Sequence, residues 1–393
     1  MAVRKLEHLA FLATILNSAQ AKEIYVSPTG TGTGTSTAPY GSIQSAVDAA
    51  AAGDVIYLRA GTYSPTTNIQ IQKSGTSTSP ITLRSYGTEE VIIDGEALPG
   101  TPYGLGEDLP SDERGILHIE GSDFWKFYNL ELINGPYGIY AVDSSSNYYE
   151  LLSTHDNYES GFQIQGESAN NTVIYLDSYR NRDPRKNGES ADGFACKEGS
   201  GEGNVLRNAR LWDNVDDGLD LYMFASAVTL EEVYSWGNGV NRWDFTEFEG
   251  DGNGFKLGIT DNPPANHIIK NCMAFSNAKK GFIDNGNPGS LTFTRNTAWN
   301  NGDTGFVMRS SSSTLTSNIA AVNSASPQVS LVAGSTSSGN SWDSSTTWSN
   351  SSFKSVSPTT LTGARDADGS VHDTDFLIPT SDAAIGASTK VTI

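Results

Sequence analysis

Two short patterns recur along this 393-residue chain, and their spacing limits what it can fold into. One is an asparagine that follows a strand-like segment, and the other is a glycine followed by a bulky apolar residue. The asparagines are Asn157, Asn181, Asn214, Asn238, Asn277 and Asn301, and the glycines are Gly161, Gly193, Gly218, Gly254, Gly281 and Gly305. Each glycine precedes the next asparagine by 20 to 23 residues, whereas each asparagine precedes its own glycine by 4 to 16. Insertions confined to one corner of a repeat are typical of solenoids.

The basic repeat of 24 residues, as from Asn157 to Asn181, is too short for a strand and a helix with their turns. It suits three short strands, and successive coils would then stack at about 4.8 Å, the spacing between paired strands. The 40 glycines and the absence of recurring stripes with a helical period favour the same structure. We therefore expect an all-β fold, a parallel β-helix, and the general preference of crossover connections makes it right-handed.

One helix is expected, over residues 43–52, ahead of the β-strands. Residues 55–58 follow as a predicted strand and residues 61–63 as a predicted turn. A solenoid exposes the apolar core of its first coil, so a single amphipathic helix at this position predicts an N-terminal cap.

Residues 1–21 resemble a secretory signal peptide, with Arg4 and Lys5 before an apolar core at residues 9–16 and small residues near Ala21. A short N-terminal helix is the alternative. No later segment is long and apolar enough to span a membrane. We expect a secreted, extracellular protein whose residues 22–393 form one domain: cap and first coils (22–115), core coils with the active site (116–335), and C-terminal coils with a tail (336–393).

The chain is acidic, with a formal net charge of −20. Removal of residues 1–21 leaves 23 basic and 44 acidic residues, a net charge of −21. This argues against nucleic acid as a partner, because phosphate binding requires clustered basic side chains. A polyanionic substrate would need a bridging cation.

The two cysteines, Cys196 and Cys272, lie in strand-like segments and are predicted to be buried free thiols. We also expect the protein to be a monomer.

Register along the coils predicts which side chains face the interior. The residues after each glycine should form an inward apolar stack: Phe162, Phe194, Leu219, Phe255, Phe282 and Phe306. The aromatic residues two positions before the asparagines are interpreted as another core file rather than a sugar-stacking surface: Tyr179, Trp212, Trp236, Phe275 and Trp299. The repeated asparagines should form a ladder of side-chain hydrogen bonds.

The same register gathers charged residues on the outer surface. Asp192 and Asp217 each precede a glycine in adjacent coils, and Asp216 lies beside Asp217. Asp220 and Lys256 each lie two residues after a glycine, so alternation along the strand points both outward. Four carboxylates this close repel each other unless a cation lies among them, and calcium suits such oxygen ligands. Zinc is disfavoured because the patch lacks His and Cys.

A structural calcium site, or solvated aspartates in turns, is the alternative interpretation of this patch. Two features favour a functional site. Lys256 should lie next to the ion on a strand, and the two longest insertions, residues 182–192 and 239–253, should flank the patch and form a groove.

These segments resemble the family 9 polysaccharide lyases, which are endo-acting pectate lyases built on a right-handed parallel β-helix. The resemblance rests on residues 191–194, 212–222, 252–258, 271–275, 296–302, 375–377 and 385–387, within residues 25–393. It implies that Asp192, Asp216, Asp217 and Asp220 bind a catalytic Ca²⁺ and that Lys256 is the Brønsted base. The acidic loop around Asp244, Glu247, Glu249 and Asp251 has no counterpart in the resemblance.

The implied reaction is cleavage of polygalacturonate by β-elimination, giving 4,5-unsaturated oligogalacturonides. A lysine base has an ordinary pKa of about 10.4, and the aspartates favour its charged form, so we expect an alkaline rate optimum. Residues expected to contact the substrate are Tyr137, Arg182, Arg185, Tyr222 and Arg242.

Three other functions remain open from the sequence. A polygalacturonase-type hydrolase would use paired carboxylates such as Asp216 and Asp217 as acid and base, but the His and Arg-x-Lys motifs expected of that family are missing. A rhamnogalacturonan lyase or another uronan lyase would share the chemistry, since specificity resides in loops. A non-catalytic glycan-binding β-helix would explain the repeat but not the convergence of Lys256 with the aspartates.

Overall fold

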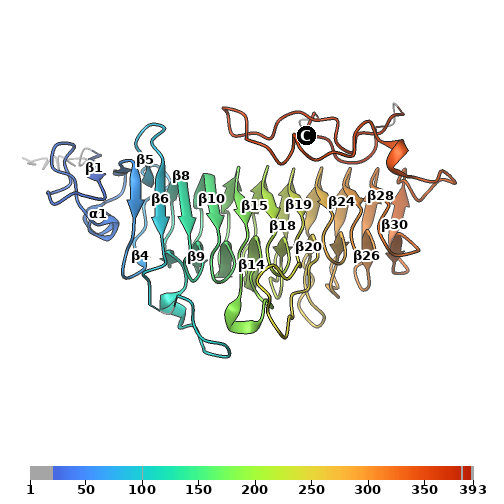
Figure 1. The fold of residues 1–393 in the computed structure, drawn as a ribbon, viewed down its shortest axis with the longest axis horizontal. Coiled ribbons are helices and arrows are strands. Elements are labelled where there is room, and N and C mark those ends of the chain that lie inside the picture. The colour runs from blue at the N-terminus through green and yellow to red at the C-terminus, as the bar shows by residue number, and fades with distance from the viewer. Residues whose placement is uncertain (1–20, 100, 382–383, 391–393) are drawn as a thin grey trace, which may run out of the picture.

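The computed structural model describes residues 21–99, 101–381 and 384–390, so the predicted signal peptide lies almost entirely outside the described residues. Short strands stack coil upon coil into one long parallel solenoid (Figure 1). Each regular coil contributes three strands, as the 24-residue repeat predicted. Within the part of the chain that the structure describes, no helix is long and apolar enough to cross a membrane.

One parallel sheet takes a single strand from each coil and carries the glycine–aromatic repeat. Its strands are β4 (Ile69–Ile71), β7 (Leu117–Glu120), β9 (Ile139–Val142), β11 (Phe162–Glu167), β14 (Phe194–Ser200), β17 (Leu219–Asp220), β20 (Phe255–Lys256), β23 (Phe282–Ile283), β26 (Phe306–Met308) and β29 (Val329–Leu331). The predicted inward stack is confirmed: Phe162, Phe194, Leu219, Phe255, Phe282 and Phe306 pair in register and are buried.

The other strands form a second parallel sheet that is bent along the solenoid, so that most coils contribute two strands to it. Its first row is β1 (Glu23–Val26), β2 (Val55–Leu58), β5 (Ile81–Ser85), β8 (Trp125–Ile133), β10 (Tyr148–His155), β12 (Thr172–Ile174), β15 (Asn204–Arg207), β18 (Val228–Glu231), β21 (Ile268–Lys270), β24 (Thr292–Thr294), β27 (Thr314–Thr316) and β30 (Thr336–Ser338). Its second row is β3 (Gly61–Tyr63), β6 (Val91–Asp94), β13 (Asp177–Tyr179), β16 (Arg210–Trp212), β19 (Tyr234–Trp236), β22 (Met273–Phe275), β25 (Thr297–Trp299) and β28 (Ile319–Ala321), with β8 and β10 continuing across both rows.

The predicted asparagine ladder runs through the interior of one corner. The side-chain oxygen of each asparagine accepts a hydrogen bond from the backbone N–H of the asparagine one coil earlier. The series runs from Asn157 to Asn323. These asparagines are buried, so the ladder satisfies polar groups at a corner where the strands have ended.

Both ends of the core are covered. Helix α1 (Ile43–Ala49) lies at the N-terminal end, where its buried Ile43, Ala46 and Val47 join the core (Figure 1). It ends three residues earlier than predicted because Ala50 is extended. At the other end the ring of Trp342 packs on Phe306 at 5.3 Å. Among the residues that the structure describes, three short 3₁₀ helices lie in loops: Ser111–Glu113, Pro184–Lys186 and Asn350–Ser352.

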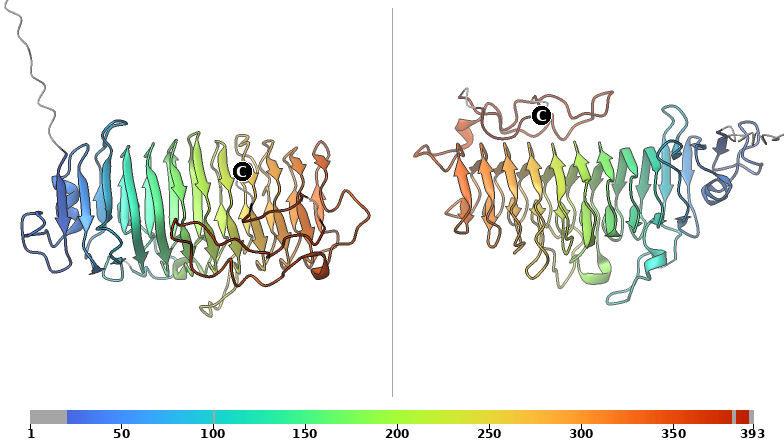
Figure 2. Two further views of the ribbon diagram at one scale, coloured as in Figure 1. Left: turned by 90° about the horizontal axis from the view of Figure 1, so that it is seen from above. Right: turned by 180° about the vertical axis from the view of Figure 1, so that it is seen from behind.

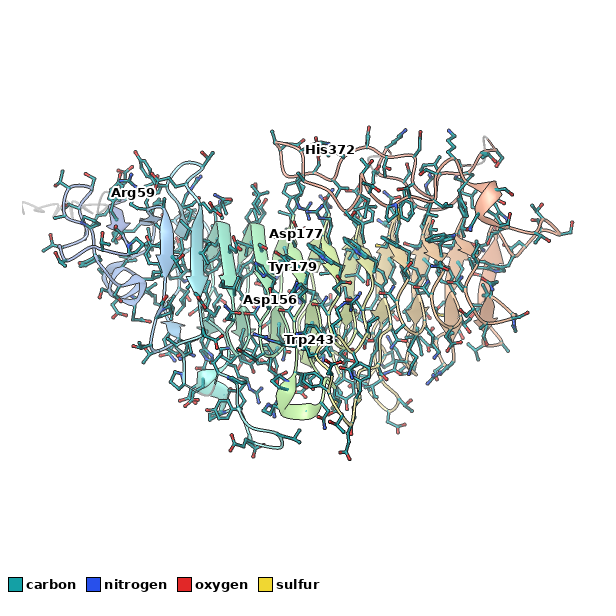
Figure 3. The ribbon with its side chains drawn as sticks, in the orientation of Figure 1. Arg59, Asp156, Asp177, Tyr179, Trp243 and His372 are labelled. Atoms are coloured by element: carbon teal, nitrogen blue, oxygen red, sulfur yellow. The ribbon has the colours of Figure 1, made fainter. Side chains whose placement is uncertain are left out.

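One expectation from the sequence was wrong, and another was right only in part. Residues 61–63 are not a turn but strand β3, which pairs with β6. The aromatic file does not join the main core, because it lies on the outer face of the second sheet, where Ser178 is buried inside and its neighbour Tyr179 faces outward (Figure 3). Phe275 and Trp299 are nevertheless buried in a smaller apolar cluster on that face. The rings of Tyr179, Trp212, Trp236 and Phe275 stack face to face at 4.2 to 5.3 Å. Their neighbours cover the ring faces on which a sugar would stack.

Residues 339–381 and 384–390 leave the last coil and run back along this outer face (Figures 1 and 2). Phe376 of this tail packs on Phe275 and Trp299 in a second, smaller apolar cluster. The largest loops project from the opposite side of the solenoid, so the tail leaves them uncovered (Figure 2). Cys196 and Cys272 are buried free thiols, as predicted.

Candidate active site

The predicted charged residues come from three neighbouring strands, β14, β17 and β20. Their register aligns Ala195, Asp220 and Lys256, so Asp220 and Lys256 are lateral neighbours. Asp192, Asp216 and Asp217 lie in the turns just before these strands. Strand register read from the sequence therefore predicted correctly that Asp220 lies beside Lys256, and the turn aspartates lie close to them.

A glycine is required between each turn residue and its strand. A Cβ atom at Gly193 would lie 2.7 Å from the carbonyl oxygen of Gly218 and 2.8 Å from the side-chain nitrogen of Asn214. The same crowding recurs at Gly218 and Gly254. Because the asparagine ladder passes directly beneath, only glycine lets the chain turn there and present its preceding aspartate.

The carboxylates of Asp192, Asp217 and Asp220 each offer an oxygen, and these oxygens all lie within 4.8 Å of one another. Asp216 and Asp217 form a second such group with Asp251. Asp192, Asp216, Asp217 and Asp220 are at most 1% exposed. One side-chain oxygen of each of Asp216, Asp217 and Asp220 accepts no hydrogen bond from any residue that the structure describes, although that of Asp217 lies 3.3 Å from the Lys256 nitrogen.

Burial and mutual repulsion disfavour negative charge on most of this cluster. Burial, with the neighbouring Asp220 and Asp217, raises the pKa of Asp192 to about 7 despite Lys197. Burial also raises the pKa of Asp217 to about 6 and that of Asp216 well above the ordinary range. Burial opposes ionisation of Asp220 too, yet Lys197 and Lys256 outweigh it and lower its pKa. A bound cation would relieve the repulsion.

The ammonium of Lys256 lies among these carboxylates. Its Nζ is 3.3 Å from Asp217, 3.5 Å from Asp220 and 3.1 Å from Asp251. Burial disfavours its charge, but the surrounding aspartates outweigh burial and raise its pKa. Its side chain is 12% exposed, so its nitrogen can still be reached from the surface.

The residues present fit a hard divalent cation. The cluster offers only carboxylate oxygens, several without a hydrogen-bond donor, and neither His nor Cys belongs to the groups found among the described residues. Calcium binds six to eight such oxygens with loose geometry, whereas zinc prefers nitrogen and sulfur ligands.

A groove of about 450 Å³ opens above the cluster. Its lining is almost entirely charged or polar: Arg114, Tyr137, Glu159, Gln163, Arg185, Lys186, Glu189, Ser190, Lys197, Glu198, Asp220, Tyr222, Glu249, Asp251 and Lys256. Both long insertions contribute to it, as predicted. A groove of this kind can hold a polar polymer across several coils.

The predicted substrate contacts divide into two groups. Tyr137, Tyr222 and Arg185 line the groove, and the ring of Tyr222 lies 6.0 Å from the Lys256 nitrogen. Arg182 and Arg242 do not line it. The guanidinium of Arg182 lies 4.2 Å above the ring of Tyr158. Arg242 is held 2.6 Å from Asp213, outside the groove. Local partners fix these two arginines elsewhere.

The sequence did not predict that two further charged residues, Lys197 and Asp251, belong to the site. Lys197 lies two residues beyond Ala195 on β14, so alternation places both on the outer face, and this was the available signal. Asp251 ends a long loop, and no periodic pattern fixes where such a loop returns. The structure brings both to the aspartate cluster.

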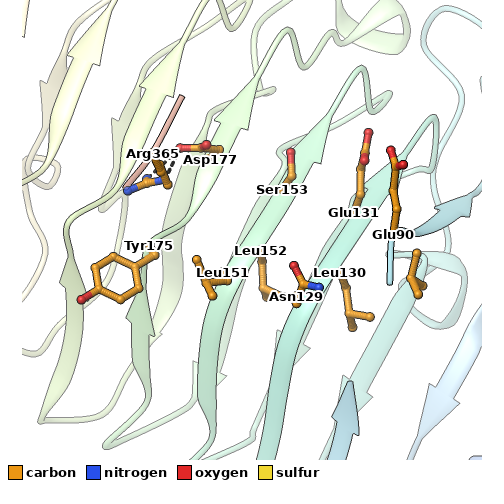
Figure 4. A pocket seen from close by; sticks show the side chains of 11 residues that line it. Glu90, Asn129, Leu130, Glu131, Leu151, Leu152, Ser153, Tyr175, Asp177 and Arg365 are labelled. Atoms are coloured by element: carbon orange, nitrogen blue, oxygen red, sulfur yellow. Dashed lines mark hydrogen bonds and ion pairs between the residues drawn. The ribbon is translucent and has the colours of Figure 1, made fainter. Parts of the chain in front are cut away.

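A second hollow, of about 210 Å³, lies on the outer face near the tail (Figure 4). It is lined by Glu90, Glu131 and Asp177, and its one basic residue, Arg365, already pairs with Asp177. This hollow therefore offers little to an anionic polymer, and the groove over Lys256 is the better candidate.

Comparison with known proteins agrees with this architecture. The family model for the Pel9A-like right-handed β-helix region matches residues 24–323. Pectate lyase PEL9 of Emericella nidulans is 58% identical over 96% of this chain and 97% of that protein. The crystal structure of pectate lyase Pel9A has a TM-score of 0.78 at 32% identity, covering 93% of this chain and 91% of that one. A rhamnogalacturonan lyase structure has a TM-score of 0.77 at 24% identity, covering 92% and 97%, and shares the fold. This chain belongs to the Pel9A-like family of right-handed parallel β-helix lyases.

Proposed function

We propose that this protein is a secreted, monomeric, calcium-dependent pectate lyase that cleaves polygalacturonate within the chain by β-elimination. The observation that carries the proposal is the convergence of four buried aspartates and Lys256 beneath an open polar groove. The pectate lyases among the relatives support the same reaction class.

Asp192, Asp216, Asp217 and Asp220 would hold the calcium. Bound there, calcium supplies charge stabilisation to the uronate carboxylate beside the carbon that loses its proton. A bound calcium would also offset the repulsion between this acidic protein and an acidic polymer, because it bridges the carboxylates of both.

Lys256 would accept the proton from C5 of the uronate. The C–H electrons form the C4–C5 double bond, and the glycosidic oxygen at C4 leaves with its sugar chain and takes a proton from water to become a hydroxyl group. The 12% exposure of Lys256 at the groove floor allows contact with substrate while limiting access of water. General-base catalysis of this kind typically contributes a factor of about 10² to 10⁴ in rate.

The first test is the ultraviolet absorbance of polygalacturonate incubated with the protein, with calcium, then with chelator, then with calcium restored. We expect absorbance to rise only when calcium is present, because elimination creates a conjugated double bond. New reducing ends without absorbance would instead indicate hydrolysis by Asp216 and Asp217. A rapid fall in viscosity relative to the number of bonds cleaved would indicate internal cleavage.

Rhamnogalacturonan should be assayed in parallel. The rhamnogalacturonan lyase resembles this chain in fold, so the same chemistry on that polymer is the second candidate. A protein that bound either polymer without producing absorbance or reducing ends would be a glycan-binding module.

A further inference from the structure

Lys197 is a second, largely buried lysine at the aspartate cluster, and the proposed elimination step does not use it. Its Nζ lies 2.7 Å from Asp192 and 3.0 Å from Asp220. Its side chain, on the outer face of β14, is 13% exposed and lines the groove. An ordinary lysine is protonated at neutral pH, and the contacts with Asp192 and Asp220 favour its charged form.

Both carboxylates that hold Lys197 belong to the group whose oxygens converge for a cation. The Asp220 carboxylate is shared, because Lys256 also lies 3.5 Å from the same oxygen. A divalent cation bound there would be a third positively charged group in contact with the buried Asp220 carboxylate. Positive groups gathered around one carboxylate repel each other strongly where water is excluded, so a bound calcium would weaken the ion pairs of the two ammonium groups.

The two lysines differ in the ion pairs that would remain to them if calcium bound Asp192, Asp217 and Asp220. Lys256 keeps Asp251, a carboxylate outside the proposed ligand set, at 3.1 Å. The two carboxylates that pair with Lys197, Asp192 and Asp220, are both proposed calcium ligands. Lys197 is therefore the lysine that a bound calcium would displace, and its flexible four-carbon stem would let the ammonium move into the adjoining groove.

We propose that Lys197 is a tethered cation that competes with calcium for Asp192 and Asp220 and, once displaced, pairs with a uronate carboxylate in the groove. The inference rests on the proposed calcium site. Lys197 then lowers the affinity of the free enzyme for calcium and raises the affinity of the calcium-loaded enzyme for its polyanionic substrate.

Calcium titration by calorimetry, without substrate, tests the competition. We expect Lys197→Met to bind calcium at least about tenfold more tightly than the wild type. Lys197→Arg keeps the charge and should stay near the wild-type affinity. The matched control is Lys280→Met, which removes a lysine that pairs with Asp303 at 2.7 Å, and its calcium affinity should not change.

Steady-state kinetics at saturating calcium test the second role. Lys197→Met should raise KM for polygalacturonate by about fivefold, with a smaller change in kcat, and Lys197→Arg should restore KM. Calcium affinity that is unchanged or weaker in Lys197→Met would overturn the competition and make Lys197 a structural counter-ion. No calcium binding by the wild type would overturn the calcium site itself.

Discussion

At the scale of single residues, the chemistry depends on how Lys256 is surrounded. Four carboxylates lie around its ammonium and raise its pKa against the effect of burial. A base must be neutral, so the rate should increase toward alkaline pH, where the amine loses its proton. A rate plateau at mildly acidic pH would contradict Lys256 as the base.

Lys256→Met should lower kcat by a factor of about 10² to 10⁴ because the proton acceptor is lost. Lys256→Arg is the sharper variant, since a guanidinium keeps the positive charge but does not deprotonate in proteins. Both variants should still bind calcium in a calorimetric titration. Near-normal elimination by Lys256→Arg, followed by ultraviolet absorbance, would assign the base to another residue.

At the scale of the element, the corner ladder fixes the register of the coils. Asn238 accepts bonds from the backbone and side chain of Asn214 and donates to Leu211 and Ser235. A second ladder, which the sequence analysis missed, follows the same rule through Asn296, Asn318 and Asn340. Both ladders supply partners for buried polar groups at corners.

Asn238→Ala should lower the free energy of unfolding by about 1–3 kcal/mol, because it leaves buried donors of Asn214 without an acceptor. Chemical denaturation measures this. Asn266→Ala is the control. Asn266 is exposed and accepts one hydrogen bond, from the backbone N–H of Ser290, so this substitution should change the free energy of unfolding by no more than about 0.5 kcal/mol. Equal effects of the two substitutions would show that the ladder adds no particular stability.

At the scale of the whole molecule, a largely buried network of ion pairs attaches the C-terminal tail to the outer face of the solenoid. Arg365 of the tail pairs with Asp177 of β13 (Figure 4). Arg210 of β16 pairs with the same carboxylate. Arg365 also donates to Asn208 and to the carbonyl oxygens of Leu176 and Gly369. Arg365 thus joins the tail to two adjacent coils, through Asp177 in one and Asn208 in the next.

Arg365→Ala should lower the free energy of unfolding by about 1–3 kcal/mol, because it removes buried hydrogen bonds while Arg210 still pairs with Asp177. It should also make residues 339–390 sensitive to limited proteolysis. The control is Lys390→Ala, because Lys390 pairs with Asp375 at 2.7 Å on the exposed side of the tail. That pair should contribute less than about 1 kcal/mol. A tail that resists protease in Arg365→Ala would show that Phe376 and its apolar neighbours hold it alone.

The pH dependence of this attachment has a definite sign. Burial opposes ionisation of Asp177, but Arg210 and Arg365 outweigh it and lower its pKa below 3.8. The stabilisation is therefore fully present above the unfolded value and is lost as pH falls through the folded pKa. Protection of the tail should persist at pH 5 and disappear only in stronger acid.

The sequence by itself determined the coil and the centre of the site. Asparagine and glycine–aromatic repeats at nearly constant spacing fix strand register, and register makes Asp220 and Lys256 neighbours without any knowledge of the loops. The tertiary structure alone decided the rest. Asp251 reaches the cluster from a long insertion, and the tail covers part of an aromatic file that strand alternation could not assign to the inner or outer face. Periodic segments are fixed by their nearest coils, whereas loops and the tail are placed by long-range contacts that leave no repeating pattern in the sequence.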